Sequence, residues 1–283
     1  MVRLQVEVSS YCNMKCPICS HKILTRQMGF MPIELWQKIV LDAKENGHLI
    51  DYLHHMGEPL LWPHIINGIN FLTKNGLKTQ ISTNGILLTE EMAKNLYYAG
   101  QEEIIVAIDT LNPIAYEKIR GSKTILENIK KNIYTVLSNT NLKIKAQFMP
   151  TKYNLDETKD DFLKEFKSPN FFIDDWFVVR PEGAENASTF LTHTIDEIDK
   201  SLCDKLYERL VVLWNGQTVL CCLDVQGEMI TGDLNKNSIS EIFYGDRAEF
   251  FREQIKSKKF PQTCKKCFAD HLILHNIVKG KKE

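Results

Sequence analysis

The stretch Cys12-Asn-Met-Lys-Cys16-Pro-Ile-Cys19 places three thiols within eight residues, directly after a segment in which apolar and polar residues alternate. That segment, residues 4–8, predicts a β-strand, so the cysteines lie in the loop that follows it. Three thiolates can bind one soft metal centre. A zinc site needs a fourth ligand, for which His21 is close in sequence, whereas an iron–sulfur cubane held by three cysteines keeps one iron open. The residues alone leave both interpretations standing.

Short apolar runs and amphipathic stretches alternate along the first two thirds of the chain. The expected strands cover residues 4–8, 50–54, 78–82, 104–108, 142–148 and 171–179. The expected helices cover residues 33–46, 64–75, a stretch after Thr89, 124–137 and 155–166. Six strand–helix units predict an α/β fold with a parallel sheet, either an open doubly wound sheet or a partial barrel. In both arrangements, functional residues gather at the C-terminal ends of the strands.

The pattern changes from about residue 195 onward. A short helical stretch at Cys203 precedes two apolar runs, 210–214 and 218–222, which predict a β-hairpin around Asn215-Gly216 because Asn-Gly favours a two-residue turn. A helix is expected over 238–255, and Cys264-Lys-Lys-Cys267 follows it. All eight cysteines lie at the two ends of the chain, and residues 20–202 hold none. We therefore expect two cysteine sites and two domains, 1–190 and 191–283.

Composition excludes several classes of protein. The chain has 283 residues, 43% hydrophobic and 25% charged, which is the balance of an ordinary globular protein and not of a disordered, collagen-like or coiled-coil chain. Its formal net charge of −1 lacks the basic excess expected of a nucleic-acid binder. No run of 18 apolar residues predicts a membrane span. The alternating start is unlike a signal peptide, and clustered thiols suit a reducing compartment, so we expect the protein in the cytoplasm.

The Cys-x3-Cys-x2-Cys spacing after a first strand resembles that of the radical S-adenosylmethionine (SAM) superfamily. The resemblance covers residues 1–180 and implies a partial (β/α)6 TIM-like barrel, followed here by a small cysteine-ligated hairpin and helix module. It implies that Cys12, Cys16 and Cys19 hold a [4Fe–4S] cluster whose open iron chelates SAM. An electron donor such as a flavodoxin or ferredoxin would then drive cleavage of SAM to a 5′-deoxyadenosyl radical.

Further motifs of the chain resemble the SAM-binding segments of that family. Gly57-Glu58-Pro59 matches its Gly-Glu-Pro turn, in which glycine permits close approach and a carboxylate suits the SAM ammonium. Ser82 and Asn84 correspond to residues at the ribose hydroxyls. The resemblance thus implies SAM contacts from the following residues: Ile18, Gly57, Glu58, Pro59, Ser82, Asn84 and Gln147. Ile18 stands where the family usually has an aromatic residue beside adenine, and Gln147 has plain barrel lining as an alternative role.

The C-terminal cysteines resemble the ligands of the auxiliary-cluster module called twitch, a short form of the SPASM domain. The resemblance implies a second [4Fe–4S] cluster held by four residues: Cys203, Cys221, Cys264 and Cys267. A structural zinc ribbon also uses four cysteine ligands and is the alternative. The chain has too few cysteines for the two clusters of a full SPASM domain.

Three residues near this module are candidates for the chemistry itself. Cys222 is either buried filler or a hydrogen-atom donor to substrate, and strand alternation would put it and Cys221 on opposite faces. Asp224 either accepts a hydrogen bond or a proton from the substrate, or caps a loop. Arg180 is either a substrate clamp, as in the related aminocyclitol dehydrogenase, or a surface residue. We expect His54 and His55, which precede the Gly-Glu-Pro turn, to be structural.

The resemblance implies a radical SAM oxidoreductase that takes a hydrogen atom from carbon, with the auxiliary cluster accepting the substrate electron. Peptide-modifying relatives often carry an additional N-terminal recognition domain that this sequence does not show, which favours a carbohydrate, an aminocyclitol or a similar small substrate. One alternative is an epimerase or a peptide-modifying enzyme in which Cys222 donates hydrogen. A non-catalytic zinc-binding module is a more distant alternative.

Overall fold

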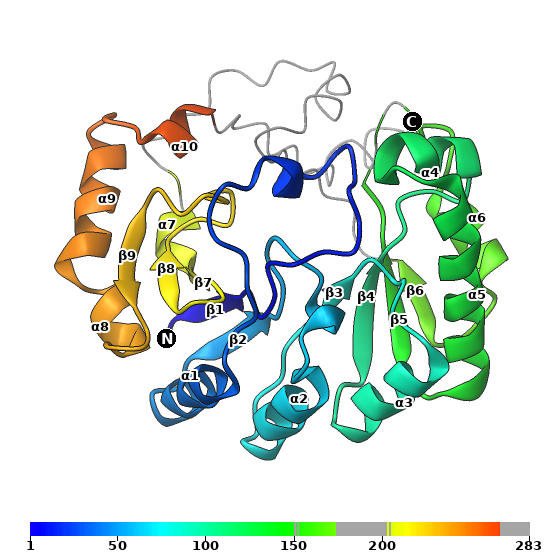
Figure 1. The fold of residues 1–283 in the computed structure, drawn as a ribbon, viewed down its shortest axis with the longest axis horizontal. Helices are drawn as coiled ribbons and strands as arrows, with labels where there is room; N and C mark the ends of the chain where they lie inside the picture. The colour runs from blue at the N-terminus through cyan, green and yellow to red at the C-terminus, as the bar shows by residue number, and fades with distance from the viewer. Residues whose placement is uncertain (150, 152, 174–202, 204, 267–283) are drawn as a thin grey trace, which may run out of the picture.

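The structure is a computed structural model that describes residues 1–149, 151, 153–173, 203 and 205–266. Its parallel strands, in chain order, are β1 (Arg3–Val6), β2 (Leu49–Tyr52), β3 (Ser82–Thr83), β4 (Glu103–Ala107), β5 (Lys143–Gln147) and β6 (Phe171–Ile173). Strands β3 to β6 pair in sequence order, and β1 pairs with β2. A parallel bridge between Tyr52 and Gln80 connects β2 to the segment before β3. The strands form one arc, which confirms the expected partial barrel (Figure 1).

The helices that connect these strands lie along the outer side of the arc (Figure 1). They are α1 (Ile33–Glu45), α2 (Ile65–Lys74), α3 (Glu90–Tyr98), α4 (Pro113–Arg120), α5 (Lys123–Asn139) and α6 (Lys159–Glu165). The expected helices are all present. Thr89 starts α3 by accepting a hydrogen bond from the Met92 amide, as its sequence position predicts. Helix α4 was not among the expected helices; it begins with Pro113 in its first turn and is capped by Gly121, whose φ is +94°.

The C-terminal module extends the barrel sheet. Strand β7 (Arg209–Val212) pairs in parallel with β1 along its free edge, in register from Arg3↔Arg209 to Val6↔Val212. Strand β8 (Gln217–Val219) pairs antiparallel with β7, and β9 (Ile230–Asp233) with β8. The expected hairpin is therefore present. The sequence pattern did not predict β9 or the pairing of β7 with β1, because both partners of that pairing lie far apart in the chain.

The hairpin turn is longer than expected. The Leu213 amide donates to the Gln217 carbonyl at 2.8 Å, which leaves a three-residue loop of Trp214, Asn215 and Gly216. Gly216 has φ of +91°, the left-handed conformation that this loop type requires. Strand β8 ends at Val219, earlier than the expected residue 222.

The expected single helix over residues 238–255 is two helices, α8 (Ile239–Phe243) and α9 (Asp246–Lys256). They separate at Gly245, where a Cβ atom would lie 2.4 Å from the carbonyl oxygen of Glu241. Glycine permits that close approach and lets the chain change direction. Shorter helical segments are the 3-10 turns η1 (Ser20–Ile23) and η2 (Pro59–Leu61) and the helices α7 (Lys205–Glu208) and α10 (Gln262–Lys266).

The two faces of the barrel strands differ in polarity. In β1, Leu4 and Val6 are fully buried in the apolar core that the outer helices share. Gln5, on the other face, donates a hydrogen bond to the carbonyl of His54 at 3.0 Å. In β5, Lys145 and Gln147 are likewise half-buried and polar. A closed barrel of this type is usually filled with branched apolar side chains, so the polar inner face indicates a lumen that holds polar groups.

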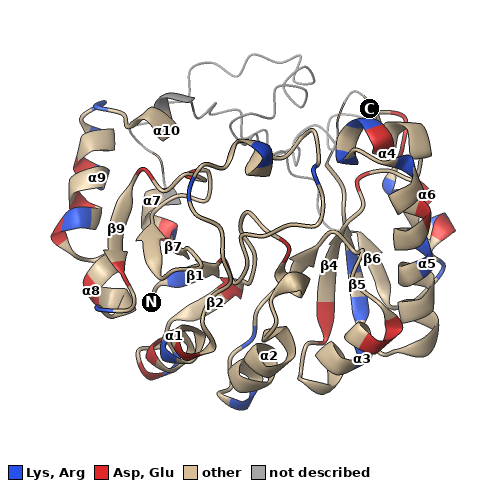
Figure 2. Ribbon diagram, in the orientation of Figure 1, with Lys and Arg blue, Asp and Glu red and all other residues tan. Residues whose placement is uncertain are grey.

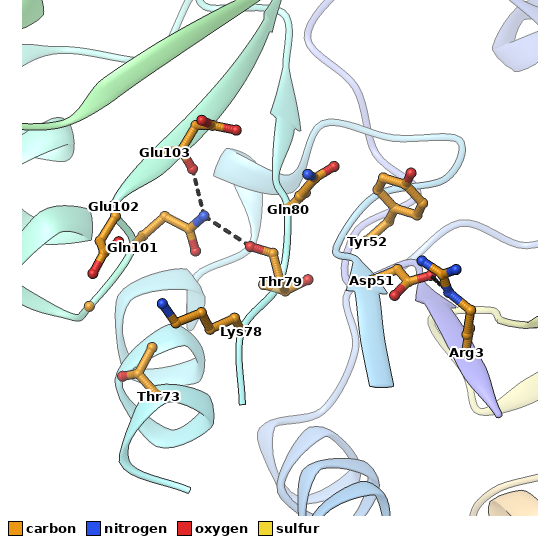
Figure 3. A pocket seen from close by; sticks show the side chains of 11 residues that line it. Arg3, Asp51, Tyr52, Thr73, Lys78, Thr79, Gln80, Gln101, Glu102 and Glu103 are labelled. Atoms are coloured by element: carbon orange, nitrogen blue, oxygen red, sulfur yellow. Dashed lines mark hydrogen bonds and ion pairs between the residues drawn. The ribbon is translucent and has the colours of Figure 1, made fainter. Parts of the chain in front are cut away.

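A hollow of about 400 Å³ lies between the first residues of β1 and β4, the last residues of β2 and the segment before β3 (Figure 3). Arg3 and Asp51 form an ion pair there, and the Gln101 amide donates to the carbonyls of Thr79 and Glu103. The cysteine loop follows the opposite end of β1. Catalytic residues of such barrels lie at the C-terminal ends of the strands, so this hollow is not the candidate site.

Charges of both signs alternate along the outer helices (Figure 2). This distribution agrees with the formal net charge of −1. Within the described ranges, every helix is either too short or too polar to cross a lipid bilayer.

Replacing Leu210 with alanine tests whether β7 is part of the barrel core. Leu210 is fully buried, so the substitution should lower the free energy of unfolding of the whole barrel by about 2–5 kcal/mol. The measurement is urea unfolding followed by tryptophan fluorescence and circular dichroism. Leu41→Ala is the control, because Leu41 is 40% exposed on α1 and should change little. Two separate transitions, with that of the barrel unchanged, would contradict the prediction.

Candidate active site

Three chain segments meet at the C-terminal ends of β1, β2 and β3. At Gly57, a Cβ atom would lie 2.1 Å from the carbonyl oxygen of Ser9 and 2.7 Å from that of Tyr11. The next amide, that of Glu58, donates to the Tyr11 carbonyl at 2.8 Å. Only glycine fits such an approach of two backbones. The Gly-Glu-Pro turn therefore packs directly on the start of the loop that carries Cys12.

The carboxylate of Glu58 is 2% exposed and holds this turn to the end of β3. It accepts hydrogen bonds from the Leu60 amide at 3.0 Å, the Thr83 hydroxyl at 2.7 Å and the Asn84 amide at 2.8 Å. Burial raises the pKa of Glu58 above its ordinary value. A carboxylate has about four acceptor positions, so most of them are occupied within the protein. Its expected contact with the SAM ammonium stays a prediction.

Asn84 connects the end of β3 with the cysteine loop. Its side-chain amide donates to the Asn13 side chain at 2.7 Å and lies 3.9 Å from the Cys12 sulfur. Asn84 is 8% exposed. The structure thus brings together Asn84, Cys12 and the turn after β2.

Ser82 and Gln147 form a second group on the inner face. The Ser82 hydroxyl lies 3.4 Å from the side-chain oxygen of Gln147, and its amide donates to His54 Nδ1 at 3.2 Å. Burial lowers the pKa of His54 to about 4, so its ring is neutral at pH 7 and carries its proton on Nε2. Ile18, by contrast, is 5% exposed and packs in the apolar core.

The surroundings of the first three cysteines suit an anionic sulfur centre. Burial raises the pKa of Cys12 to about 11 and also raises that of Cys19, so these two thiols are protonated at neutral pH without metal. The Arg120 guanidinium lies 3.9 Å from the Cys16 sulfur and pairs with Asp109. The hydroxyl of Tyr116, which interacts electrostatically with Cys16, is buried without a hydrogen-bond partner among the described residues. A cation and an orphaned donor beside thiols are groups that thiolate ligands of a cluster would satisfy.

The loop thiols and His21 were the sequence candidates for a metal site after β1. Within the described ranges, no three His, Cys, Asp or Glu side chains have the geometry of a metal site. His21, the sequence candidate for a fourth zinc ligand, already uses its ring Nε2 in a 2.8 Å hydrogen bond with the Ser10 carbonyl.

The second cysteine group lies just beyond β8. Cys221 is buried, and a hydrogen bond with the Cys222 thiol, together with burial, raises its pKa well above the ordinary value. The expectation that these two thiols lie on opposite faces is wrong, because β8 ends at Val219 and alternation stops there. Cys203 lies close enough to influence Cys221 electrostatically.

Asp224 organises the loop that follows. It is fully buried and accepts hydrogen bonds from the amides of Glu228 at 2.8 Å and Met229 at 2.7 Å. The Thr263 hydroxyl lies 3.4 Å from Asp224, and the Thr263 amide donates to Glu228 at 2.8 Å. These contacts bring Cys264 to the loop of Cys221. They match the loop-cap alternative for Asp224, whose catalytic role stays a prediction. Arg180 and Cys267 lie outside the described residues.

Sequence reasoning missed a buried charged group at the end of β1. Glu7 pairs with Arg26 and with His55, and His55 Nε2 lies 2.8 Å from the carbonyl oxygen of Cys222. The signal was present in the alternation of Arg3, Gln5 and Glu7, which places a carboxylate on the inner face of the first strand.

The comparisons with known proteins agree with this arrangement. Residues 6–162 match the model of the radical SAM superfamily, which is more than half of the chain, and residues 203–268 match that of SPASM, an iron–sulfur cluster-binding domain. The chain belongs to the radical SAM superfamily. It is a radical SAM enzyme with a C-terminal SPASM-type module, and these two domains imply SAM and [4Fe–4S] clusters as cofactors.

Individual relatives differ in what they act on. The tungsten-containing aldehyde ferredoxin oxidoreductase cofactor-modifying protein of Pyrococcus furiosus is 25% identical over 312 residues, covering 94% of this chain and 87% of the relative. A probable GTP 3′,8-cyclase of Methanococcus aeolicus is 34% identical over 137 residues, covering 46% of this chain and 44% of the cyclase. The match to the cyclase thus spans less than half of either protein.

Solved structures share the fold. BtrN in complex with AdoMet and 2-DOIA has a TM-score of 0.64 at 19% identity, covering 95% of this chain and 94% of BtrN. The structure of anSMEcpe with AdoMet and the Cp18Cys peptide has a TM-score of 0.63 at 17% identity, covering 94% and 86%. At these identities the likeness shows the fold alone.

Tyr116→Phe should have opposite effects on the metal-free and the cluster-loaded protein. Without metal, it removes a buried hydroxyl that lacks a partner among the described residues, so the free energy of unfolding should rise by about 1 kcal/mol. If Cys16 binds the cluster as a thiolate, we expect the Tyr116 hydroxyl to donate to it, so the variant should lose iron faster to a chelator. Urea unfolding and iron release measure the two effects.

Tyr134→Phe is the matched control, because Tyr134 is 42% exposed and its hydroxyl donates to Glu165 at 2.8 Å. It should stabilise neither form. A metal-free Tyr116→Phe protein less stable than the parent would contradict the assignment of an orphaned hydroxyl.

Proposed function

We propose that the protein is a radical SAM oxidoreductase that removes a hydrogen atom from a carbon of a polar small molecule such as a carbohydrate or an aminocyclitol. One observation carries the proposal: both cysteine groups adjoin the same end of the barrel. The first follows β1 directly, and the second is tied to the turn after β2 by the contact between His55 and the Cys222 carbonyl. A substrate at this end of the lumen would lie between the two.

The chain's own residues would hold the cofactors. The proposed ligands of the first cluster are Cys12, Cys16 and Cys19, and those of the second are Cys203, Cys221, Cys264 and Cys267. The proposed SAM contacts are Ile18, Gly57, Glu58, Pro59, Ser82, Asn84 and Gln147. When bound, SAM and the first cluster supply a radical that takes hydrogen from carbon, and the second cluster supplies an acceptor for the remaining substrate electron. The barrel orients the target C–H bond and keeps water away from it.

The inner face of the barrel supports a hydrophilic substrate. Its half-buried groups near the C-terminal ends of β2, β3 and β5 combine donors and acceptors: His54, Ser82 and Gln147. A polar substrate can exchange hydrogen bonds with these groups, whereas an apolar substrate offers them none. Proposed catalytic groups are Arg180 as a substrate clamp, and Asp224 and Cys222.

An epimerase or a peptide-modifying enzyme is the second candidate. The observation that favours an epimerase is the Cys222 thiol, which is half-buried beside Cys221 and extra to a four-cysteine ligand set. A thiol can return a hydrogen atom to a substrate carbon. In that case no net oxidation occurs and the second cluster does not accept a substrate electron.

A low-potential electron donor such as a flavodoxin or ferredoxin is the proposed protein partner. Lys15 and Lys22 are exposed on the loop of the first cysteine group and would suit an acidic donor. We place the reaction in the cytoplasm, because the clustered cysteines need a reducing compartment.

Changing Cys12, Cys16 and Cys19 together to alanine should abolish 5′-deoxyadenosine formation while the protein stays folded. Iron should fall from about eight to about four atoms per chain, because one of two cubanes is lost. Iron analysis and an assay for 5′-deoxyadenosine measure both effects. Cys222→Ala serves as the control and should keep all the iron. A triple variant that still cleaves SAM, or a parent protein with about two zinc ions and no iron, would overturn the proposed function.

Cys222→Ala separates oxidation from epimerisation. If the enzyme is an oxidoreductase, the variant should keep turnover, because no thiol is needed to return hydrogen; its backbone carbonyl still accepts from His55. If it is an epimerase, product formation should stop while 5′-deoxyadenosine is still made. Mass spectrometry of the product in deuterated water completes the test. Solvent deuterium at carbon without net oxidation in the parent protein would decide against the oxidoreductase.

A further inference from the structure

The carboxylate of Glu7, at the end of β1, is fully buried and collects donors from three parts of the chain. Arg26 binds it through both terminal nitrogens, at 2.8 and 2.5 Å. His55 Nδ1 lies 3.2 Å from it, the Met56 amide 3.3 Å, and the Trp214 amide 3.4 Å. One carboxylate thus joins the cysteine loop, the turn after β2 and the hairpin turn of the C-terminal module.

Charge and hydrogen bonding at this group are complementary. The hydrogen bonds and charges of His55 and Arg26 outweigh the effect of burial and lower the pKa of Glu7 to about 2. Both ring nitrogens of His55 face oxygen acceptors, the Glu7 carboxylate and the Cys222 carbonyl. His55 therefore connects Glu7 with the residue that follows Cys221.

The loop around Arg26 is fastened to the C-terminal module along its length. Arg26 Nε donates to the Val225 carbonyl at 2.8 Å. The Gln226 side chain accepts from the Thr25 amide at 2.9 Å and donates to the Ile23 carbonyl at 2.7 Å. These contacts link a segment four residues beyond Cys19 to a segment four residues beyond Cys221.

We propose that Glu7, Arg26 and His55 are positioning residues that hold the loop of the first cysteine group and the Cys221 loop in one fixed arrangement across the barrel mouth. They set the spacing between the two cysteine groups and hence the width of the site in which a substrate lies. The effect on the width of a substrate site rests on the proposed function, whereas the contacts themselves do not depend on any bound group.

A purely stabilising role would not need charged residues. Replacing a buried ion pair by apolar side chains of similar size is often neutral or stabilising, because burial of charge costs hydration. Planar, directional contacts such as the two-point Arg26–Glu7 pair add geometric specificity that apolar packing lacks. The position of the group at the junction of three segments is where such specificity has an effect.

Hydrogen–deuterium exchange on the full-length, cluster-loaded protein tests the proposal. In Glu7→Gln, which preserves shape but removes the charge, amide exchange should become at least tenfold faster in residues 21–29 and in residues 213–229 together. Helices α1, α2 and α5 should be unchanged. Glu165→Gln is the matched control, because Glu165 pairs with Lys130 between α6 and α5, away from both segments. Faster exchange in only one segment, or uniformly over the chain, would overturn the proposal.

Arg26→Lys is the second variant, for use if Glu7→Gln does not fold. It keeps the positive charge but loses the two-point contact, so the same two segments should exchange faster together, by a smaller factor. In the same sample, the magnetic interaction between the two reduced clusters, measured by electron paramagnetic resonance, should become more heterogeneous than in the parent. An unchanged spectrum with unchanged exchange would refute the positioning role.

These readouts separate the inference from the proposed function. Iron analysis that finds no second cluster in the parent protein refutes the proposed function. The exchange result then still decides whether Glu7, Arg26 and His55 are positioning residues. Two clusters with normal turnover, together with unaltered exchange in both variants, refute the positioning role of Glu7, Arg26 and His55 and leave the proposed function intact.

Discussion

Strand β1 has a parallel neighbour on each edge, β2 on one side and β7 on the other, and most of the candidate site depends on this arrangement. The strand brings its buried face to the outer helices and its polar face to the lumen. The first cysteine group follows it in the chain, and Cys221 and Cys222 of the second group follow the hairpin that starts with β7. Because both groups branch from a strand pair in fixed register, the sheet determines which end of the barrel they share.

The helices and the cysteine motifs were the predictable part of the molecule. Local signals decide them: Thr89 caps α3, and Ser238 and Glu241 form a capping box at the start of α8. The motif spacing predicted the radical SAM barrel and the SPASM-type module, and the family models confirm both. The Gly-Glu-Pro turn was also readable, since the close approach at Gly57 leaves room for no side chain.

The parts that could not be predicted depend on contacts between distant segments. The pairing of β7 with β1, in which Arg209 lies opposite Arg3, is visible only in the folded sheet. The apolar pattern of a strand does not indicate which other strand it will pair with. The orientation of Cys221 and Cys222 depends on where β8 ends, and β8 ends at Val219, before the expected residue 222. Helix α4 was missed because a proline usually indicates the end of a helix. Pro113 instead occupies the first turn of α4, where proline is favoured.

The two cysteine groups are built on a similar electrostatic plan. Beside the first, Arg120 approaches Cys16 and is held by Asp109, a buried residue just after β4. At the second, His55 approaches the Cys222 carbonyl and is held by Glu7, a buried residue just after β1.

A thiol must lose its proton to bind iron. Burial raises the pKa of Cys12, and the hydrogen bond to Cys222 together with burial raises the pKa of Cys221. Both raised pKa values oppose loss of the proton. A cation fixed nearby offsets this cost once thiolates form, whereas a mobile one would pair with water instead. Carboxylates at the ends of barrel strands, Asp109 and Glu7, hold Arg120 and His55 in place, so the rigid part of the fold supports both cysteine loops.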